Sequence, residues 1–556
     1  MGTEATETDV LIAGAGPVGM ALAIELGRRG IRAILIESQE RAGRNPRAKT
    51  TNVRSMEHMR RWGLAAEVRA EAPLPLDYAR DVVFATRLFG HPIHRFENAL
   101  FMGPAGDQRF SEPSQWIPQY RLEDVLRRHI ATLPSVTLRL GARLEAAHQD
   151  AGGVTAVVTD VATGASQSVS ARYLAGADGA RSTTREIIGA RMAGEHGFAS
   201  FLSLVVHAPG LAEAHPQAPA IMYWLLNTDG PALMGPMDRG DLWFWIGPVA
   251  PDVRPDAAEA RRRVVGSLGA TFPFEIVTVD PWLAHRLMAD KYRDRRMFLI
   301  GDACHLHPPF GGYGMNMGIG DAVDLGWKLA AVLQGWGGAT LLDSYEIERR
   351  PVHRWTIDEA VENVGFFRDY FADGRLEADT ADGVAARASL AAEVAAAKTR
   401  EFRALGMVLG ARYDGSPVIA ADGRPAPRID PLNYEPSAAP GGRAPHVWLG
   451  QGRSLFDAFG PGFTLLVTAG DGAGPEVAAL VRTAATVGVP LVICAPGHAA
   501  LPALYGARFA LIRPDQHVAW RGDAGPADWS ALLDLVCGRD AASSAPEIGR
   551  SRAAQG

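Results

Sequence analysis

Two glycine-rich segments of this chain place an acidic residue where it can contact an anionic, polyhydroxylated ligand. In residues 297–320 a short apolar run, Met297–Ile300, is followed by Gly301, Asp302 and a loop rich in glycine and proline. A helical pattern begins near Ile319. An acid at the end of a buried strand, before a loop that opens a helix, suits hydrogen bonding to ligand hydroxyl groups, and the helix start suits phosphates.

The N-terminus carries the second pattern. A predicted strand over residues 8–13 runs directly into a glycine-rich loop and a helix. Such glycines permit a tight turn, close approach of the backbone to a pyrophosphate, and close packing of helix on strand. The next apolar run ends on Glu37, whose carboxylate suits both hydroxyls of a ribose and disfavours a 2′-phosphate there. The residues assigned to the loop are Gly14, Gly16, Pro17, Val18 and Gly19.

A third segment, 173–182, lies between these two. An apolar run ends in Asp178 and Gly179, and Arg181 follows closely. Asp-Gly is a common turn pair, but its place after an apolar run and before a basic segment favours a ligand-facing loop. One fold must therefore bring together motifs that are far apart in the sequence.

Together these motifs resemble the class A FAD-dependent aromatic hydroxylases, the para-hydroxybenzoate hydroxylase and phenol hydroxylase group. That family carries, in this order, a GxGxxG loop with a distal glutamate, an Asp-Gly motif, and Gly-Asp before a proline- and glycine-rich loop. The resemblance covers most of the chain and implies FAD as the tightly held cofactor, with NADPH or NADH as a transient co-substrate. Further matching segments are 46–48, 54–57, 119–123, 345–351 and 513–521.

The resemblance implies an α/β fold with three parts: a Rossmann-like FAD-binding domain of the glutathione reductase type, an inserted β-sheet substrate domain, and a thioredoxin-like C-terminal domain. The three cysteines form no CxxC motif, so for the C-terminal domain we expect a role in packing or in a homodimer rather than in redox chemistry. The predicted limits are 1–75, 110–185 and 285–360 for the FAD-binding domain, 76–109 and 186–284 for the substrate domain, 361–430 for a helical connection, 431–545 for the thioredoxin-like domain and 546–556 for a disordered tail.

Roles for individual residues also follow from the resemblance. Glu37 would bind the adenosine ribose and Asp302 the ribityl hydroxyls. Backbone N–H groups of Met315 and Asn316 would face the flavin N1/O2 edge, where negative charge grows on reduction. The catalytic loop, on the substrate side of the isoalloxazine, would consist of Pro308, Pro309, Phe310 and Gly311, and Pro309 would also contact the cofactor. The remaining cofactor-facing positions are Arg47, Gln119, Gly301 and Gly314, with Asp178 and Arg181 facing either the flavin or the nicotinamide.

In this family NADPH or NADH reduces the flavin, O2 adds at flavin C4a, and the resulting hydroperoxide transfers one oxygen atom to an electron-rich ring. The implied function is hydroxylation of a phenolic or polycyclic aromatic substrate. Baeyer–Villiger insertion into a ketone, or oxidation of an antibiotic, would use the same cofactor residues. A non-catalytic flavin-binding protein is an alternative of a different class, which failure of a broad panel of phenols to stimulate NAD(P)H oxidation would favour.

Departures from the family pattern leave the substrate side open. Phe310 and Tyr313 stand where smaller or more polar residues are frequent, which favours a larger or more apolar aromatic substrate. No residue that would deprotonate a phenol is identifiable from the sequence. Aromatic residues of two predicted strands are further candidates to line the pocket, although alternating aromatics are also typical of sheet packing. They are Tyr223, Trp224, Trp243 and Trp245.

Composition and short motifs exclude several other classes. His305 and His307 resemble a metal-binding pair, but no acidic or cysteine cluster accompanies them in the sequence and the Pro-Pro that follows favours a flavin loop, so we predict no metal site. A net charge of −6 without a long basic run disfavours nucleic acid. No apolar segment approaches the roughly 20 residues that cross a bilayer. The absence of a signal-peptide pattern and the three unpaired cysteines predict a cytoplasmic protein.

Overall fold

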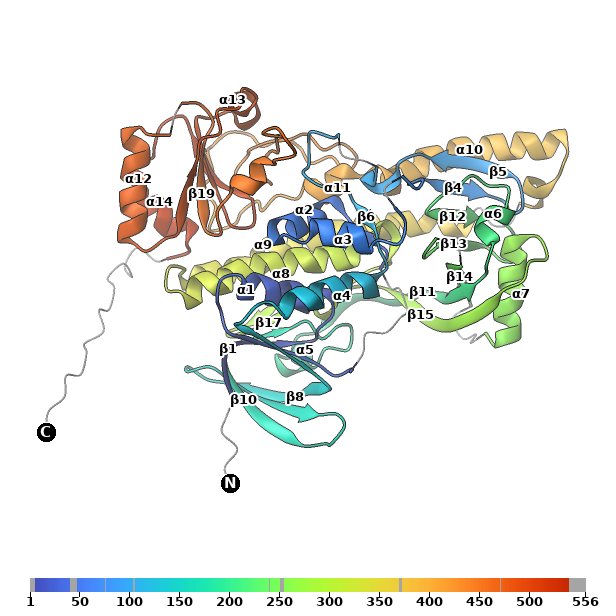
Figure 1. Ribbon diagram of the computed structural model, residues 1–556, viewed down its shortest axis with the longest axis horizontal. Helices are drawn as coiled ribbons and strands as arrows, with labels where there is room; N and C mark the ends of the chain where they lie inside the picture. Colours follow the sequence, from blue (N-terminus) through green and yellow to red (C-terminus); the bar gives the residue numbers. More distant parts are fainter. Residues whose placement is uncertain are drawn as a thin grey trace, which may run out of the picture.

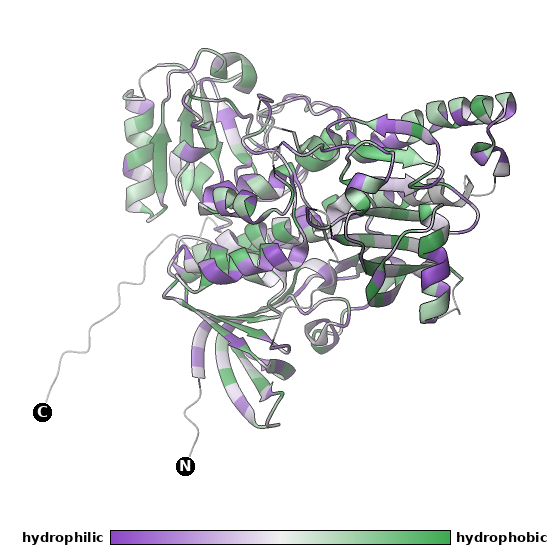
Figure 2. Cartoon of the chain, turned by 45° about the vertical axis from the view of Figure 1, so that its right-hand side comes forward, coloured by the Kyte–Doolittle hydropathy of each residue, from purple (hydrophilic) through white to green (hydrophobic). Residues whose placement is uncertain are grey.

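The computed structural model of the chain contains three large β-sheets with helices packed around them, and a two-stranded ribbon (Figure 1). The strands are coloured mainly as hydrophobic in Figure 2, as expected for sheet interiors. None of the described helices is both long enough and apolar enough to span a bilayer. The described residues are 6–40, 48–75, 77–103, 106–239, 241–250, 255–369, 373–470 and 472–539. Arg47 and the predicted tail 546–556 lie outside them.

The first sheet has a parallel core in the order β17-β10-β1-β2-β7. Residues 10–13 and 33–36 are buried throughout, in one hydrophobic cluster with residues of the antiparallel strands β8 and β9 and of the surrounding helices. The strands are β1 (Thr6–Ala13), β2 (Ala33–Glu37), β7 (Val136–Leu140), β8 (Ala142–Gln149), β9 (Val154–Asp160), β10 (Ser166–Gly176), β16 (Arg293–Asp294) and β17 (Met297–Leu299).

Helix α1 packs against both α4 and α8, and α8 packs in turn against α9. These four helices cross the middle of Figure 1, above the first sheet. α8 comes after β17, the last of the parallel strands, and packs against α1, which comes directly after β1. The helices are α1 (Pro17–Gly27), α2 (Val53–Trp62), α3 (Ala65–Glu71), α4 (Gln119–Ile130), α5 (Thr183–Ile187), α8 (Tyr313–Leu333) and α9 (Ala339–Asp369).

The second sheet has the strand order β18-β15-β11-β14-β13-β12-β4-β5. It extends past the predicted limit at residue 284, because β15 continues to Ala289 and β18 pairs with it. Helices α6 and α7 cover one face, and α10 packs on the other. The elements are β4 (Val82–Ala85), β5 (Pro92–Phe96), β11 (Met192–His207), β12 (Met222–Leu225), β13 (Ala232–Pro236), β14 (Leu242–Val249), β15 (Glu275–Ala289), β18 (His305–Leu306), α6 (Leu211–Ala214), α7 (Ala257–Leu268) and α10 (Ala381–Phe402).

The C-terminal unit is built around a four-stranded sheet of order β20-β19-β21-β22. β19 runs parallel to β20 and antiparallel to β21. The predicted α/β class with an inserted β-sheet domain is confirmed, while the thioredoxin-like assignment of this unit stays a prediction. The elements are β19 (Phe463–Val467), β20 (Leu491–Cys494), β21 (Phe509–Ile512), β22 (Val518–Gly522), α11 (Leu405–Leu409), α12 (Pro475–Thr486), α13 (Leu501–Tyr505) and α14 (Trp529–Val536).

Buried ion pairs join this unit to the rest of the chain. Arg513, which is fully buried, lies 2.7 Å from Glu348 on α9 and 2.9 Å from Asp324 on α8. Arg443 forms a buried salt bridge with Glu57 on α2. A guanidinium that loses its carboxylates inside a protein is strongly unfavourable, so these contacts fix the C-terminal unit against α2, α8 and α9.

Candidate cofactor and substrate site

The sequence motifs follow the carboxyl ends of adjacent parallel strands. Ala13 pairs in register with Ile36 on one side and Gly176 on the other, and Gly176 pairs with Leu299. Backbone hydrogen bonds continue the register by one residue, from Ile300 N to Gly176 O, for example, at 3.0 Å. The glycine-rich loop, Glu37, the Asp-Gly loop and the Gly-Asp loop therefore share one edge of the sheet, which is where open α/β sheets bind ligands.

Glycines allow the loops to approach one another. Gly14 has a φ of +101°, and a β-carbon on it would lie 2.3 Å from the carbonyl oxygen of Ala177. A β-carbon on Gly19 would lie 1.9 Å from the carbonyl oxygen of Gly14. By contrast, a β-carbon on Gly16 would meet nothing within 4 Å. The loop is thus packed tightly on two sides and leaves open space before α1.

Two helices direct their N-termini toward this region without a side-chain cap. α1 begins after Gly16 and α8 after Gly312, and neither residue offers a side chain to the first-turn N–H groups. Such groups have no partner within the helix and carry partial positive charge. In addition, Nε2 of His307 is buried with no hydrogen-bond partner among the described residues, and it would lie 3.3 Å from a β-carbon on Gly314. The helix N–H groups suit an anionic part of a ligand. Nδ1 of His307 lies 2.7 Å from the carbonyl oxygen of Pro308, which leaves Nε2 to accept a hydrogen bond from a ligand donor.

The side chain of Asn316, in the first turn of α8, forms hydrogen bonds with the backbone of neighbouring segments. Its Nδ2 donates to the carbonyl oxygens of Thr50, at 2.9 Å, and Gly312, at 2.6 Å. Its Oδ1 accepts from the backbone N–H of Asn52 at 2.9 Å. The side chain therefore joins α8 to the short strand β3 (Thr50–Thr51), which pairs with β6 (Gln115–Trp116). Met315 beside it is half-buried.

Two predicted ribose- and ribityl-facing acids lie at the shared edge. Glu37 is half-buried, and its Oε2 accepts from the backbone N–H of Ala15 at 3.0 Å. The carboxylate therefore also supports the glycine-rich loop. Asp302 is exposed in the 3₁₀ turn η2 (Gly301–Ala303) directly after β17. Gln119 opens α4 and donates to Glu123 at 2.8 Å.

Asp178 has a positioning role within its own loop. Its Oδ2 accepts from the backbone N–H of Thr184 at 2.8 Å and from the hydroxyl of that residue at 2.9 Å. Arg181 is exposed. The sequence shows Arg185 after the Asp-Gly loop but gives it no role. Its guanidinium donates to the carbonyl oxygens of Ala180 and Ala303 and so connects the Asp-Gly loop to the Gly-Asp loop.

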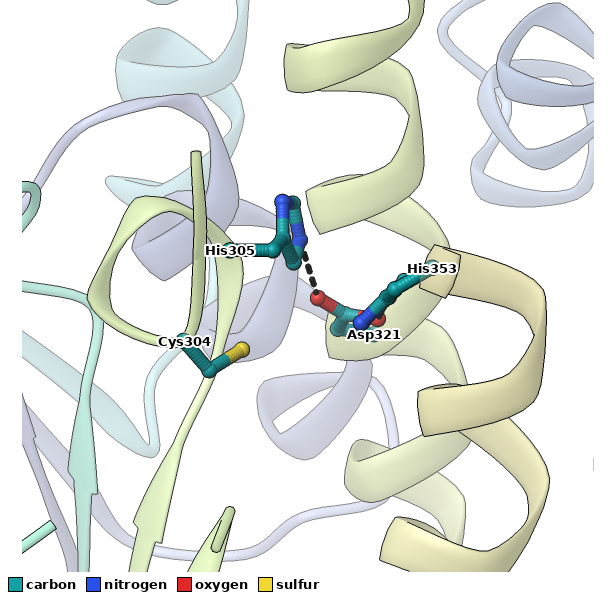
Figure 3. A group of neighbouring side chains, drawn as sticks. All are labelled: Cys304, His305, Asp321 and His353. Atoms are coloured by element: carbon teal, nitrogen blue, oxygen red, sulfur yellow. Dashed lines mark hydrogen bonds and ion pairs between the residues drawn. The ribbon is translucent and has the colours of Figure 1, made fainter. Parts of the chain in front are cut away.

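A buried hydrogen-bond network centred on Asp321 supports the Gly-Asp loop (Figure 3). Asp321 Oδ2 accepts from the backbone N–H of Gly301 at 3.1 Å and lies 3.1 Å from His305 Nε2. Oδ1 lies 2.7 Å from His353 Nε2 and accepts from Arg349 at 2.8 Å. Burial alone would raise the pKa of Asp321, but the charge of Arg349 and the hydrogen bonds with His305 and His353 hold that pKa well below its usual value. Asp321 is therefore an anion that positions the loop.

The sequence shows no acidic cluster beside His305 and His307, but the fold brings Asp321 and His353 to Cys304 and His305. One ligand-type atom from each of Cys304, His305, Asp321 and His353 lies within 4.8 Å of the others. Both carboxylate oxygens of Asp321 already accept hydrogen bonds from protein groups. The arrangement is thus explained as a hydrogen-bond network. Asp321 lies on α8 and His353 on α9. Sequence spacing alone does not show that these two helices face one loop.

An aromatic wall lies on one face of the second sheet, and Phe310 of the Pro-Gly loop packs against it. Its ring centroid is 6.0 Å from those of both Phe201 and Trp224. Pro308 is buried, Pro309 is exposed, and the N–H of Gly311 donates to Glu401 on α10 at 3.2 Å. We define the aromatic wall as Trp116, Phe201, Trp224 and Phe244.

The other predicted substrate residues lie elsewhere. Tyr223, Trp243 and Trp245 belong to the cluster on the opposite face of the sheet, beneath α7. Tyr313 belongs to a separate cluster that contains Met317 and, from α9, Ala360. Alternation along the strands explains the division, since successive side chains point to opposite faces. Of the five candidates only Trp224 shares a face with Phe310, and the placement of the three sheet residues favours the packing interpretation.

Comparison with known proteins gives the family. Residues 7–360 match the family model described as an FAD binding domain, and residues 437–539 match the one described as the C-terminal region of aromatic-ring hydroxylases. The chain belongs to the FAD-binding aromatic-ring hydroxylases. FAD is its cofactor, and it is a flavoprotein monooxygenase.

Similar proteins cover nearly the whole chain. Tetracenomycin B2 monooxygenase-dioxygenase of Streptomyces olivaceus is 34% identical over 96% of this chain and 98% of its own. The 2,4-dichlorophenol 6-monooxygenase of Delftia acidovorans is 32% identical over 93% and 95%. The solved structure of the rebeccamycin biosynthetic enzyme RebC with reduced flavin has a TM-score of 0.88 and 36% identity, and it covers 97% of this chain and 100% of that one.

Proposed function

We propose that this hydroxylase adds one oxygen atom of O2 to a phenolic or polycyclic aromatic compound, with NADPH or NADH as the reductant. The observation that carries the proposal is the contact of Phe310, in the loop after the Gly-Asp motif, with the aromatic wall. Aromatic side chains pack favourably against planar aromatic ligands. Support for a phenol comes from the relative named as a dichlorophenol monooxygenase.

The chain's own residues would divide the work between cofactor and substrate. The N-termini of α1 and α8 would bind anionic groups, Glu37 the adenosine ribose and Asp302 the ribityl hydroxyls. When bound, FAD supplies electron transfer from NAD(P)H and oxygen transfer to the substrate. Pro308 and Phe310, both buried, would exclude water from the reacting region, which suppresses side reactions with solvent.

The test is the absorption spectrum of the purified protein, followed by NAD(P)H oxidation with and without a panel of monocyclic and polycyclic phenols. We expect a bound-flavin spectrum, faster oxidation with at least one phenol, and a product heavier by one oxygen atom. NMR of the product would separate ring hydroxylation from Baeyer–Villiger insertion, because both add one oxygen atom but only the latter converts a ketone to an ester. A flavin-loaded protein that no panel member stimulates would instead support the non-catalytic alternative.

The location and assembly of the protein are proposals as well. The cysteines Cys304, Cys494 and Cys537 are all buried and free, which fits a reducing compartment such as the cytoplasm. A homodimer is the assembly we expect. Cell fractionation would test the first point, and light scattering of the purified holoenzyme the second.

A further inference from the structure

Lys49 lies where the cofactor side of the site meets the substrate side. Its carbonyl oxygen accepts from the N–H of Ile117 at 2.8 Å. The next residue, Thr50, accepts from Asn316 in the first turn of α8. The backbone of Lys49 is therefore fixed to the helix that we assign to the flavin edge.

The side chain of Lys49 reaches the aromatic wall. Its Nζ lies 4.3 Å from the centroid of the Phe244 ring. Phe244 is 2% exposed, and its ring centroid is 5.9 Å from that of Trp116. Burial lowers the pKa of Lys49 to about 8, because removal from water disfavours the ammonium form.

The chain uses lysine sparingly. Only four of its 56 Lys and Arg residues are lysine. Lys328 lies 2.8 Å from Asp324, and Lys398, which also contacts the wall through Trp224, lies 2.7 Å from Glu401. Lysine differs from arginine because its ammonium can lose a proton within the ordinary pH range. At the wall, Lys398 approaches from α10 and Lys49 approaches from the cofactor side.

We propose that Lys49 accepts the proton of the phenolic substrate and then stabilises the phenolate as its counter-ion. This inference rests on the proposed function and adds the deprotonating residue that the sequence does not identify. In the step, the phenol O–H bond breaks, the lone pair of the neutral amine forms an N–H bond, and an ammonium–phenolate pair results with no change of oxidation state. The phenolate ring is more electron-rich than the phenol and reacts faster with an electrophilic oxygen.

The test is the ionisation of a coloured phenol bound to the holoenzyme, a readout that needs no turnover. The probes are 4-nitrophenol and the polycyclic phenol alizarin, whose visible spectra change when they ionise. We expect each probe that binds to ionise at a pH about 1–3 units lower on the wild type than on Lys49→Met, because an opposite charge a few ångströms away shifts a pKa by that amount. Lys49→Arg should retain the lowered midpoint. Lys291→Met is the matched control at a lysine before β16, outside the wall, and should behave as the wild type.

Equal midpoints on the wild type and Lys49→Met would overturn the inference, and so would failure of both probes to bind the wild type. Bound FAD and the thermal midpoint show whether Lys49→Met is folded; if it is not, Lys49→Gln replaces it. A wild type that lowers the probe midpoint but oxygenates no phenol would contradict the proposed function and leave the role of Lys49 in phenolate binding intact. Phenol oxygenation by the wild type, with the same probe midpoint on the wild type and on Lys49→Met, would support the proposed function and contradict the role of Lys49.

Discussion

Gly301 packs directly against Val18: a β-carbon on Gly301 would lie 3.1 Å from the nearest side-chain atom of Val18. The first residue belongs to the Gly-Asp loop and the second to the first turn of α1. Gly301 also has a φ of +61°, which side chains with a β-carbon rarely adopt. This contact is where two motifs from opposite ends of the FAD-binding region meet.

Gly301→Ala should therefore lower both stability and FAD retention. We expect a loss of about 2–4 kcal/mol in the free energy of unfolding, from the left-handed backbone and the crowded Val18 together. Gly189→Ala is the matched control, because Gly189 has a φ of +66° but no neighbour within 4 Å of its β-carbon position. Urea unfolding of both variants separates the two effects. Equal losses would show that the contact with Val18 contributes nothing.

Glu37→Ala should weaken FAD binding by about 1.5–3 kcal/mol, because a charged acceptor is lost from the ribose and from the N–H of Ala15. The measurement is the dissociation constant of FAD from the apoprotein, by flavin fluorescence. Glu40→Ala, an exposed acid nearby, should leave that constant unchanged. Unaltered FAD affinity in Glu37→Ala would remove Glu37 from the site.

Tyr223 and Trp224 are neighbours in β12 whose side chains lie in clusters on opposite faces of the sheet. Trp224→Leu should change the KM for the aromatic substrate or the coupling of NAD(P)H oxidation to product. Tyr223→Leu should reduce stability, through lost packing and lost hydrogen bonds of its hydroxyl to Ala218 and Ala220, with kinetics nearly unchanged. Steady-state kinetics and thermal unfolding of the two variants decide the assignment. The reverse pattern would place the substrate on the α7 side.

Acid should destabilise the protein partly through His353. Burial lowers the pKa of His353 to about 3 from an ordinary 6.5, so between these values the unfolded chain binds a proton that the folded chain does not. Stability is thus lost as pH falls below about 6.5. His353→Gln cannot take up that proton, so we expect its stability relative to the wild type to improve by about 1–2 kcal/mol between about pH 7.5 and about pH 5. Urea unfolding at both values measures this, with exposed His148→Gln as the control.

The C-terminal unit should be needed for FAD binding as well as for packing. Arg443→Met leaves Glu57 on α2 without a buried partner that lies against both carboxylate oxygens, and we expect a loss of about 3–5 kcal/mol in the free energy of unfolding. Truncation after residue 430 removes Arg443 and Arg513 together and should reduce FAD retention. A truncated chain that folds and keeps its flavin would show that α2 and α8 hold their places without these contacts.

The sequence by itself determined the cofactor motifs and the α/β class, because each motif is local: a strand, a turn that needs glycine, and a helix start. It also predicted that Gly14 and Asp302 belong to one site, since neither motif is complete alone. Tertiary structure decided which partners the motifs meet. The roles of Arg185 and Asp321 could not be predicted from the sequence, because their hydrogen bonds join loops and helices that are far apart in the chain. The aromatics of β12 and β14 were ambiguous because alternation predicts two faces without showing which one Phe310 contacts. Lys49 lies outside the local motifs described above. Its Nζ lies over the ring of Phe244 only because β3 packs between α8 and the second sheet.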